Sequence, residues 1–85
     1  MPKRITSLEE LKREAKGEQD AEFFILLNFY LRSSKRIIWD EDDKRFYIIN
    51  FIDDTEQALT ESQLMDREYT NIGYAMTKGA LFKDD

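Results

Sequence analysis

Two apolar runs separated by an acidic segment constrain the fold of this chain more than any other feature. The runs are RIIWD at 36–40 and KRFYIINFID at 44–53, and DEDD at 40–43 lies between them. Aromatic and β-branched residues favour strands, and a short polar connection between two such runs is typical of a β-hairpin. We therefore expect an antiparallel hairpin with a charged tip.

The second arm of this hairpin is apolar on both faces. Side chains alternate along a strand, so one face would carry Phe46, Ile48, Asn50 and Ile52, and the other would carry Tyr47, Ile49 and Phe51. This pattern predicts a helix against one face, and either partial cover or a partner against the other.

The run AEFFILLNFYL at 21–31 is almost entirely aromatic or aliphatic, with Asn28 as its interior polar residue. Such a run fits a strand covered on both faces or a buried helix, and its short length and aromatic content favour a strand. The polar segment LRSSKR at 31–36 then has the composition of a connection, with Ser33 and Ser34 as turn formers.

Helix signals occur at both ends of the chain. Ser7 and Glu10 form a capping-box pattern that predicts a helix over 7–16, ended by Gly17. Thr60 and Gln63 repeat the pattern after an expected edge strand at 56–59. A last helix is expected at 70–79, with Thr70 or Asn71 as its cap, Ile72, Ala75 and Met76 inward and Gly79 as its end, and the ALF at 80–82 would pack back on the sheet.

These elements predict one α+β domain over residues 1–85. We expect a small antiparallel meander sheet of three or four strands, with an N-terminal helix and one or two C-terminal helices packed mostly on one face. The composition, with 41% hydrophobic and 36% charged residues, suits a small core inside a charged surface.

The composition also disfavours several classes of function. There is no Cys and no His, so disulfides, thiolate zinc sites and histidine catalysis are absent, and we expect no cofactor. The first 17 residues lack the apolar centre of a signal peptide, and no apolar stretch approaches the roughly 20 residues that span a bilayer. We expect a cytoplasmic protein without membrane contact.

The charge is −5 overall but lies in blocks. The acidic balance disfavours nucleic acid and anionic membranes as partners. Basic residues nevertheless gather at the predicted connection, where an anion would find cations and hydroxyl groups, and two aromatic residues that follow suit base stacking. This candidate binding set is Arg32, Ser33, Ser34, Lys35, Arg36, Trp39 and Tyr47. The competing interpretation is a solvated rim with its aromatics in the core, and a catalytic Ser–Lys pair is disfavoured because that lysine must be desolvated.

Two acidic groups are candidate metal or catalytic sites. The segment 40–43 offers hard oxygen ligands, but it lacks the alternating ligands and central glycine of a calcium loop, so a solvated hairpin tip is favoured. Asp53, Asp54 and Glu56 offer paired carboxylates, although aspartate is equally common as a turn residue.

Three motifs carry a resemblance to known proteins. The segments EFFILLN..LRSSKRI, FYIIN.IDDTEQ.LT and TNIG.A...GALF, within about 21–82, resemble a group of short proteins of Gram-positive bacteria, their phages and mobile elements. The group has no known activity, so the resemblance implies a bacterial or phage setting and supplies no catalytic residue.

The sequence therefore favours a non-enzymatic module that acts through a protein partner, with homodimer formation as one form of contact. Its acidic blocks would compete for a basic surface on that partner. The alternatives are a nucleic-acid or nucleotide-binding module that uses the basic segment and sheet aromatics, and a carboxylate-dependent metal enzyme that uses Asp53, Asp54 and Glu56.

Overall fold

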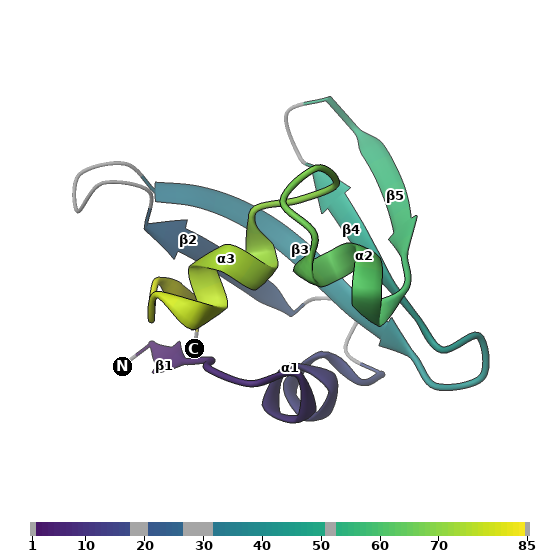
Figure 1. Ribbon diagram of the computed structural model, residues 1–85, viewed down its shortest axis with the longest axis horizontal. Helices are drawn as coiled ribbons and strands as arrows, with labels where there is room; N and C mark the ends of the chain where they lie inside the picture. The colour runs from purple at the N-terminus through teal and green to yellow at the C-terminus, as the bar shows by residue number, and fades with distance from the viewer. Residues whose placement is uncertain (1, 18–20, 27–31, 51–52, 85) are drawn as a thin grey trace.

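The computed structural model describes residues 2–17, 21–26, 32–50 and 53–84. The strands are β1 (Lys3–Arg4), β2 (Glu22–Leu26), β3 (Arg32–Asp40), β4 (Arg45–Asn50), β5 (Thr55–Leu59) and β6 (Leu81–Lys83). The helices are α1 (Leu8–Ala15), α2 (Glu61–Met65) and α3 (Ile72–Thr77). The strands form one antiparallel sheet in the order β1-β6-β2-β3-β4-β5 (Figure 1). The predicted α+β class and antiparallel sheet are confirmed.

The hairpin expected from the two apolar runs is β3 and β4. Its register pairs Ile38 with Tyr47 and Trp39 with Phe46, and a turn at 41–44 connects the strands. Lys44 has a φ of 55° in this turn. Asp40 satisfies the turn by accepting hydrogen bonds from two backbone N–H groups, those of Asp42 and Asp43. The predicted hairpin is confirmed, and its tip is a turn held by local hydrogen bonds to the Asp40 side chain.

The prediction of a connection at 31–36 is wrong for the residues the structure describes. Residues 32–36 form the first half of β3 and pair with β2, with Ser34 opposite Phe24. Polar residues are tolerated in this strand because hydrogen bonds to the neighbouring strands satisfy its backbone N–H and C=O groups. Its side chains alternate between the two faces of the sheet. Of the strand predicted at 21–31, residues 22–26 are confirmed, and 27–31 lie outside the described residues.

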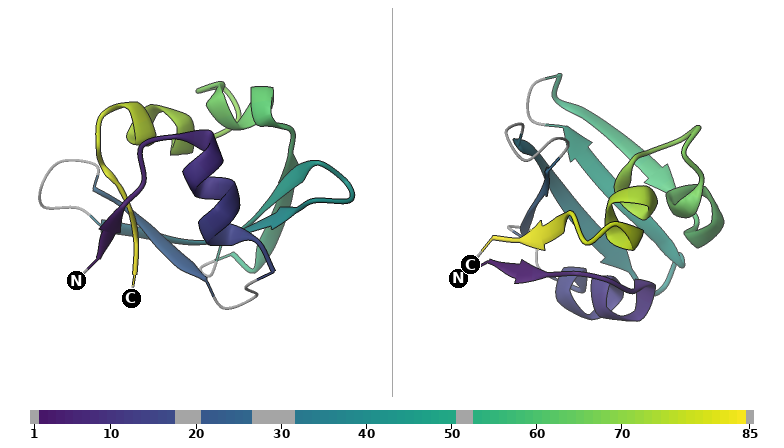
Figure 2. Two further views of the ribbon diagram at one scale, coloured as in Figure 1. Left: turned by 90° about the horizontal axis from the view of Figure 1, so that it is seen from below. Right: turned by 60° about the vertical axis from the view of Figure 1, so that its left-hand side comes forward.

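The sheet is also larger than the three- or four-stranded meander that the sequence predicted. The meander β2-β3-β4-β5 is extended beyond β2 by β6 and then β1. The expectation that the segment 80–82 packs back on the sheet is confirmed for Leu81 and Phe82, which pair with Ile25 and Phe24. Strand β1 was missed because two charged residues carry no periodic signal. The two chain ends consequently lie side by side (Figures 1 and 2).

The helix boundaries follow the predicted caps. The Ser7 side chain accepts a hydrogen bond from the Glu10 N–H at 3.2 Å, and Thr60 and Gln63 form a complete capping box at α2. Helix α3 begins after Asn71, where the Ile72 N–H donates to the Thr70 hydroxyl at 3.3 Å. No helix among the described residues has the length and apolar character needed to cross a membrane.

All three helices of the described chain lie on one face of the sheet (Figure 2). Side chains from that face and from the helices form the core cluster, and the inward positions predicted for α3 are confirmed. The fully buried members with the largest side chains are Phe23, Phe46, Ile5, Leu11, Ile37, Leu59, Leu64, Ile72 and Leu81. Near one edge, Glu14 of α1 is held by Lys3 of β1 and Lys83 of β6, which lower the pKa of its carboxyl.

Candidate functional site

The face of the sheet over which no described helix lies presents a set of apolar side chains. They occupy the positions that alternate with the core residues along β2, β3, β4 and β6, and none of them belongs to the core cluster. We call this set the open face: Phe24, Ile38, Tyr47, Ile49 and Phe82. Four of them are half-buried, and Phe24 is 7% exposed.

Two cross-strand contacts build the open face. The rings of Phe24 and Phe82 stack with their centroids 5.2 Å apart and an interplanar angle of 11°. On the neighbouring hairpin, Ile38 lies opposite Tyr47. The Tyr47 hydroxyl donates to the Asp43 carboxylate at 2.9 Å, and this hydrogen bond raises the pKa of Tyr47. Tyr47 is therefore fixed with its ring on the sheet and its polar end at the acidic tip.

Acidic residues lie at both ends of β4, which crosses the open face. The turn at 41–44 stands at one end, and the exposed residues Asp53 and Asp54 stand at the other. Asp54 has a φ of 53°, as turn aspartates often do, and Glu56 follows on β5, opposite Ile49. The open face is thus an apolar band with acidic ends, and Arg36 of β3 and Arg45 of β4 lie beside it on the same side of the sheet.

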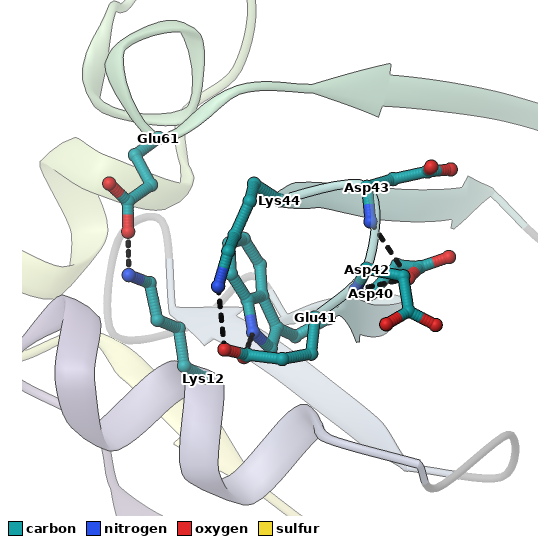
Figure 3. Close-up of polar contacts among 8 residues, drawn as sticks. Lys12, Asp40, Glu41, Asp42, Asp43, Lys44 and Glu61 are labelled. Carbon is teal, nitrogen blue, oxygen red and sulfur yellow. Dashed lines mark hydrogen bonds and ion pairs between the residues drawn. The ribbon is translucent and has the colours of Figure 1, made fainter.

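The acidic tip is organised around Trp39, the single tryptophan of the chain. Its indole N–H donates to Glu41 Oε2 at 2.6 Å, and Lys44 Nζ donates to Glu41 Oε1 at 2.7 Å. Lys12 of α1 lies 4.7 Å above the tryptophan ring and forms an ion pair with Glu61 of α2 (Figure 3). The hairpin tip therefore contacts α1 through the Trp39 ring and Lys12, and Lys12 in turn connects it to α2.

This geometry makes the tip sensitive to acid. Hydrogen bonds from Lys44 and then from Trp39 lower the pKa of the Glu41 carboxyl from 4.5 to about 2. A depressed folded-state pKa contributes stability that is complete above the unfolded value and is lost as the pH falls through the folded one. Urea unfolding between pH 6 and pH 2 should therefore show a smaller loss of stability on acidification for Glu41→Gln than for the wild type.

The matched control for this prediction is Asp42→Asn, which removes a carboxylate from the same turn without touching Trp39 or Lys44. We expect this variant to keep the acid dependence of the wild type. An unchanged acid dependence in Glu41→Gln would show that these two hydrogen bonds do not stabilise the folded state.

The two acidic groups do not form a metal centre in the part of the chain that the structure describes. No three carboxylates there lie close enough together to hold a metal ion. Asp40 and Glu41 already accept hydrogen bonds from the backbone, Trp39 and Lys44. The favoured interpretation of 40–43 as a hairpin tip fits this geometry.

The structure divides the candidate binding set between the two sides of the sheet. Ser33 and Lys35 point to the helix-bearing side, where they line a pocket. Ser34 and Arg36 alternate with them and share the side of Tyr47. The Trp39 ring is in the core, 4.5 Å from Phe46. Arg32 begins β3 and pairs with Leu26.

The pocket contains residues that the sequence did not single out. Ser33 and Lys35 meet Asn50, Thr55 and Gln57 there, from β4 and β5. A further wall comes from the segment 69–71, which precedes α3. The spacing of Ser33 and Lys35 two residues apart would have placed them on one side of a strand, had the segment been predicted as a strand.

Comparison with known proteins gives no match. No family model, no curated protein and no solved structure resembles the chain closely enough to place it in a family.

Proposed function

We propose that this chain is a non-enzymatic protein-binding module and that the open face is its contact surface. The partner would present an apolar centre flanked by Lys or Arg. The observation that carries the proposal is the apolar band of Ile38, Tyr47, Ile49 and Phe82 on a sheet face over which no described helix lies. Apolar side chains on a sheet face outside the core commonly mark a contact site.

Charge selects the class of partner. The apolar band ends at acidic residues on both sides, and the chain carries a net charge of −5. A basic partner would gain long-range attraction during association, which screening by salt weakens, and would bury its apolar centre against the band. The same acidic ends would repel the phosphates of a nucleic acid.

A second copy of this chain fits the open face less well than a basic partner does. A second copy carries the same acidic turns at 41–44 and 53–54 and the same net charge of −5, and like charges disfavour association. We therefore expect the isolated chain to remain monomeric at micromolar concentration, as measured by sedimentation velocity. If the chain forms a dimer and a substitution at Ile49 disrupts it, the open face is a surface for self-association and not for a basic partner.

The test uses one substitution on each side of the molecule. Ile49→Lys places a cation in the middle of the open face, where it forms an attractive cross-strand pair with Glu56 of β5 and a repulsive one with Arg36 of β3. Tyr74→Ser alters a side chain on α3 that is 41% exposed and belongs to the helix-bearing side. Retained circular dichroism would establish that both variants are folded.

Proteins retained by the immobilised wild-type chain would be purified and their affinities measured by calorimetry. We expect Ile49→Lys to weaken binding of a direct partner at least tenfold and Tyr74→Ser to leave it unchanged. Asp53→Asn with Asp54→Asn should reduce the salt dependence of the affinity. Equal binding by wild type and Ile49→Lys would contradict the proposal.

A further inference from the structure

The pocket on the helix-bearing side is separate from the open face and has its own chemistry. It has a volume of about 270 Å³, which is small for a ligand site. Ile25 of β2 and Ile48 of β4 contribute apolar lining, and the segment 69–71 contributes to the wall. Its position between four strands and the segment before α3 makes it a concavity fixed by the fold.

Most of the remaining lining is neutral and polar. Hydroxyl groups come from Ser33, Thr55 and Thr70, and side-chain amides come from Gln57 and Asn71. Hydroxyl and amide groups both donate and accept hydrogen bonds, so they match the hydroxyl groups of a polar ligand. Such a lining suits a small polyol better than an apolar molecule.

Among the residues that the structure describes, Lys35 is the charged member of this lining, and no carboxylate joins it there. The Lys35 residue is half-exposed, and its ammonium makes no hydrogen bond or ion pair with the residues that the structure describes. The pocket is therefore locally cationic within a chain of net charge −5. A cation in a concave site without a carboxylate partner attracts an anion.

We propose that this pocket binds a small phosphate monoester that carries hydroxyl groups, of the size of glycerol phosphate or a sugar phosphate. The Lys35 ammonium acts as a point charge for the phosphate, as lysine does in other phosphate sites. The neutral side chains hydrogen-bond the ligand hydroxyls, and the isoleucine side chains contact its C–H groups. The proposal does not depend on the function assigned to the open face.

The test is a titration of ¹⁵N-labelled protein with glycerol 3-phosphate, inorganic phosphate and glycerol, followed by amide chemical shifts. We expect saturable shifts at Ser33, Lys35, Thr55, Gln57 and Thr70, with glycerol 3-phosphate tighter than inorganic phosphate and glycerol showing no saturation at 10 mM. No saturable binding of glycerol 3-phosphate at 10 mM, or shifts scattered away from the pocket, would overturn the proposal.

Three substitutions test whether glycerol 3-phosphate binds at the pocket. Lys35→Gln removes the cation, and Gln57→Glu adds a carboxylate to the lining at an exposed position of the edge strand β5. Each should weaken glycerol 3-phosphate binding at least tenfold. Lys78→Gln removes an exposed lysine at the end of α3 and should leave the affinity unchanged. Wild-type affinity in the folded Lys35→Gln or Gln57→Glu variant would overturn the assignment.

Discussion

Replacing Phe46 by alanine is expected to destabilise the fold by about 3–5 kcal/mol, the usual cost of removing a fully buried phenylalanine. Phe46 has no exposed surface, packs 4.5 Å from Trp39 and pairs with Leu59 of β5. Because domains of this length have roughly 5–10 kcal/mol of total stability, this one substitution would leave a protein close to unfolding. Urea denaturation followed by circular dichroism measures the effect.

The control is Tyr47→Ala in the next position, whose side chain lies on the open face. Tyr47 is half-buried and its hydroxyl is hydrogen-bonded to Asp43, so we expect a loss less than half as large as that of Phe46→Ala. Equal losses at the two positions would mean that both faces of β4 are buried to the same degree, which would contradict an open face that none of the described helices covers.

Replacing Gly73 by alanine should destabilise the protein by about 3 kcal/mol, although alanine favours helices by about 1 kcal/mol over glycine. A Cβ atom at Gly73 would lie 2.6 Å from the Met65 Cα and 2.9 Å from the Leu64 carbonyl oxygen. Helices α2 and α3 meet at this point, so their backbones would have to separate. The midpoint of urea unfolding measures the loss.

Gly17→Ala separates this steric effect from an effect of backbone conformation. Gly17 has a φ of 70° and open space where a Cβ would stand, so the substitution should cost about 1 kcal/mol through φ alone. A Gly73→Ala protein as stable as the wild type would show that α2 and α3 do not approach as closely as the structure has them.

The sequence predicts the parts of this fold that local chemistry determines. The β3–β4 hairpin follows from strand formers around a polar turn, and α1 and α2 follow from capping side chains at Ser7 and Thr60. Strand β1 was not predicted because its two residues form a strand only through their pairing with β6. Pairing between segments that are distant in the sequence leaves no local sequence pattern. The segment at 32–36 was misassigned because serine and lysine in an internal strand have the composition of a turn.

Of the two candidate sites, the sequence predicts part of the open face but not the pocket. Alternation along β4 predicts that Tyr47 and Ile49 share one face, and none of the helices in the described part of the chain lies on that face. The pocket was not predictable, because it joins Lys35 to Gln57 and to the segment 69–71 through tertiary packing. What the sequence grouped as one basic cluster is two sets of side chains, and Lys35 and Arg36 point to opposite sides of the sheet.

Mapping the interface with the purified partner shows directly whether the open face is the contact surface. Amide signals of ¹⁵N-labelled protein would be followed as the unlabelled partner is added. We expect the perturbed signals to concentrate at Ile38, Tyr47, Ile49 and Phe82 and at the acidic turns beside them. Perturbation confined to α1, α2 and α3, with the signals of the open face unchanged, would contradict this expectation.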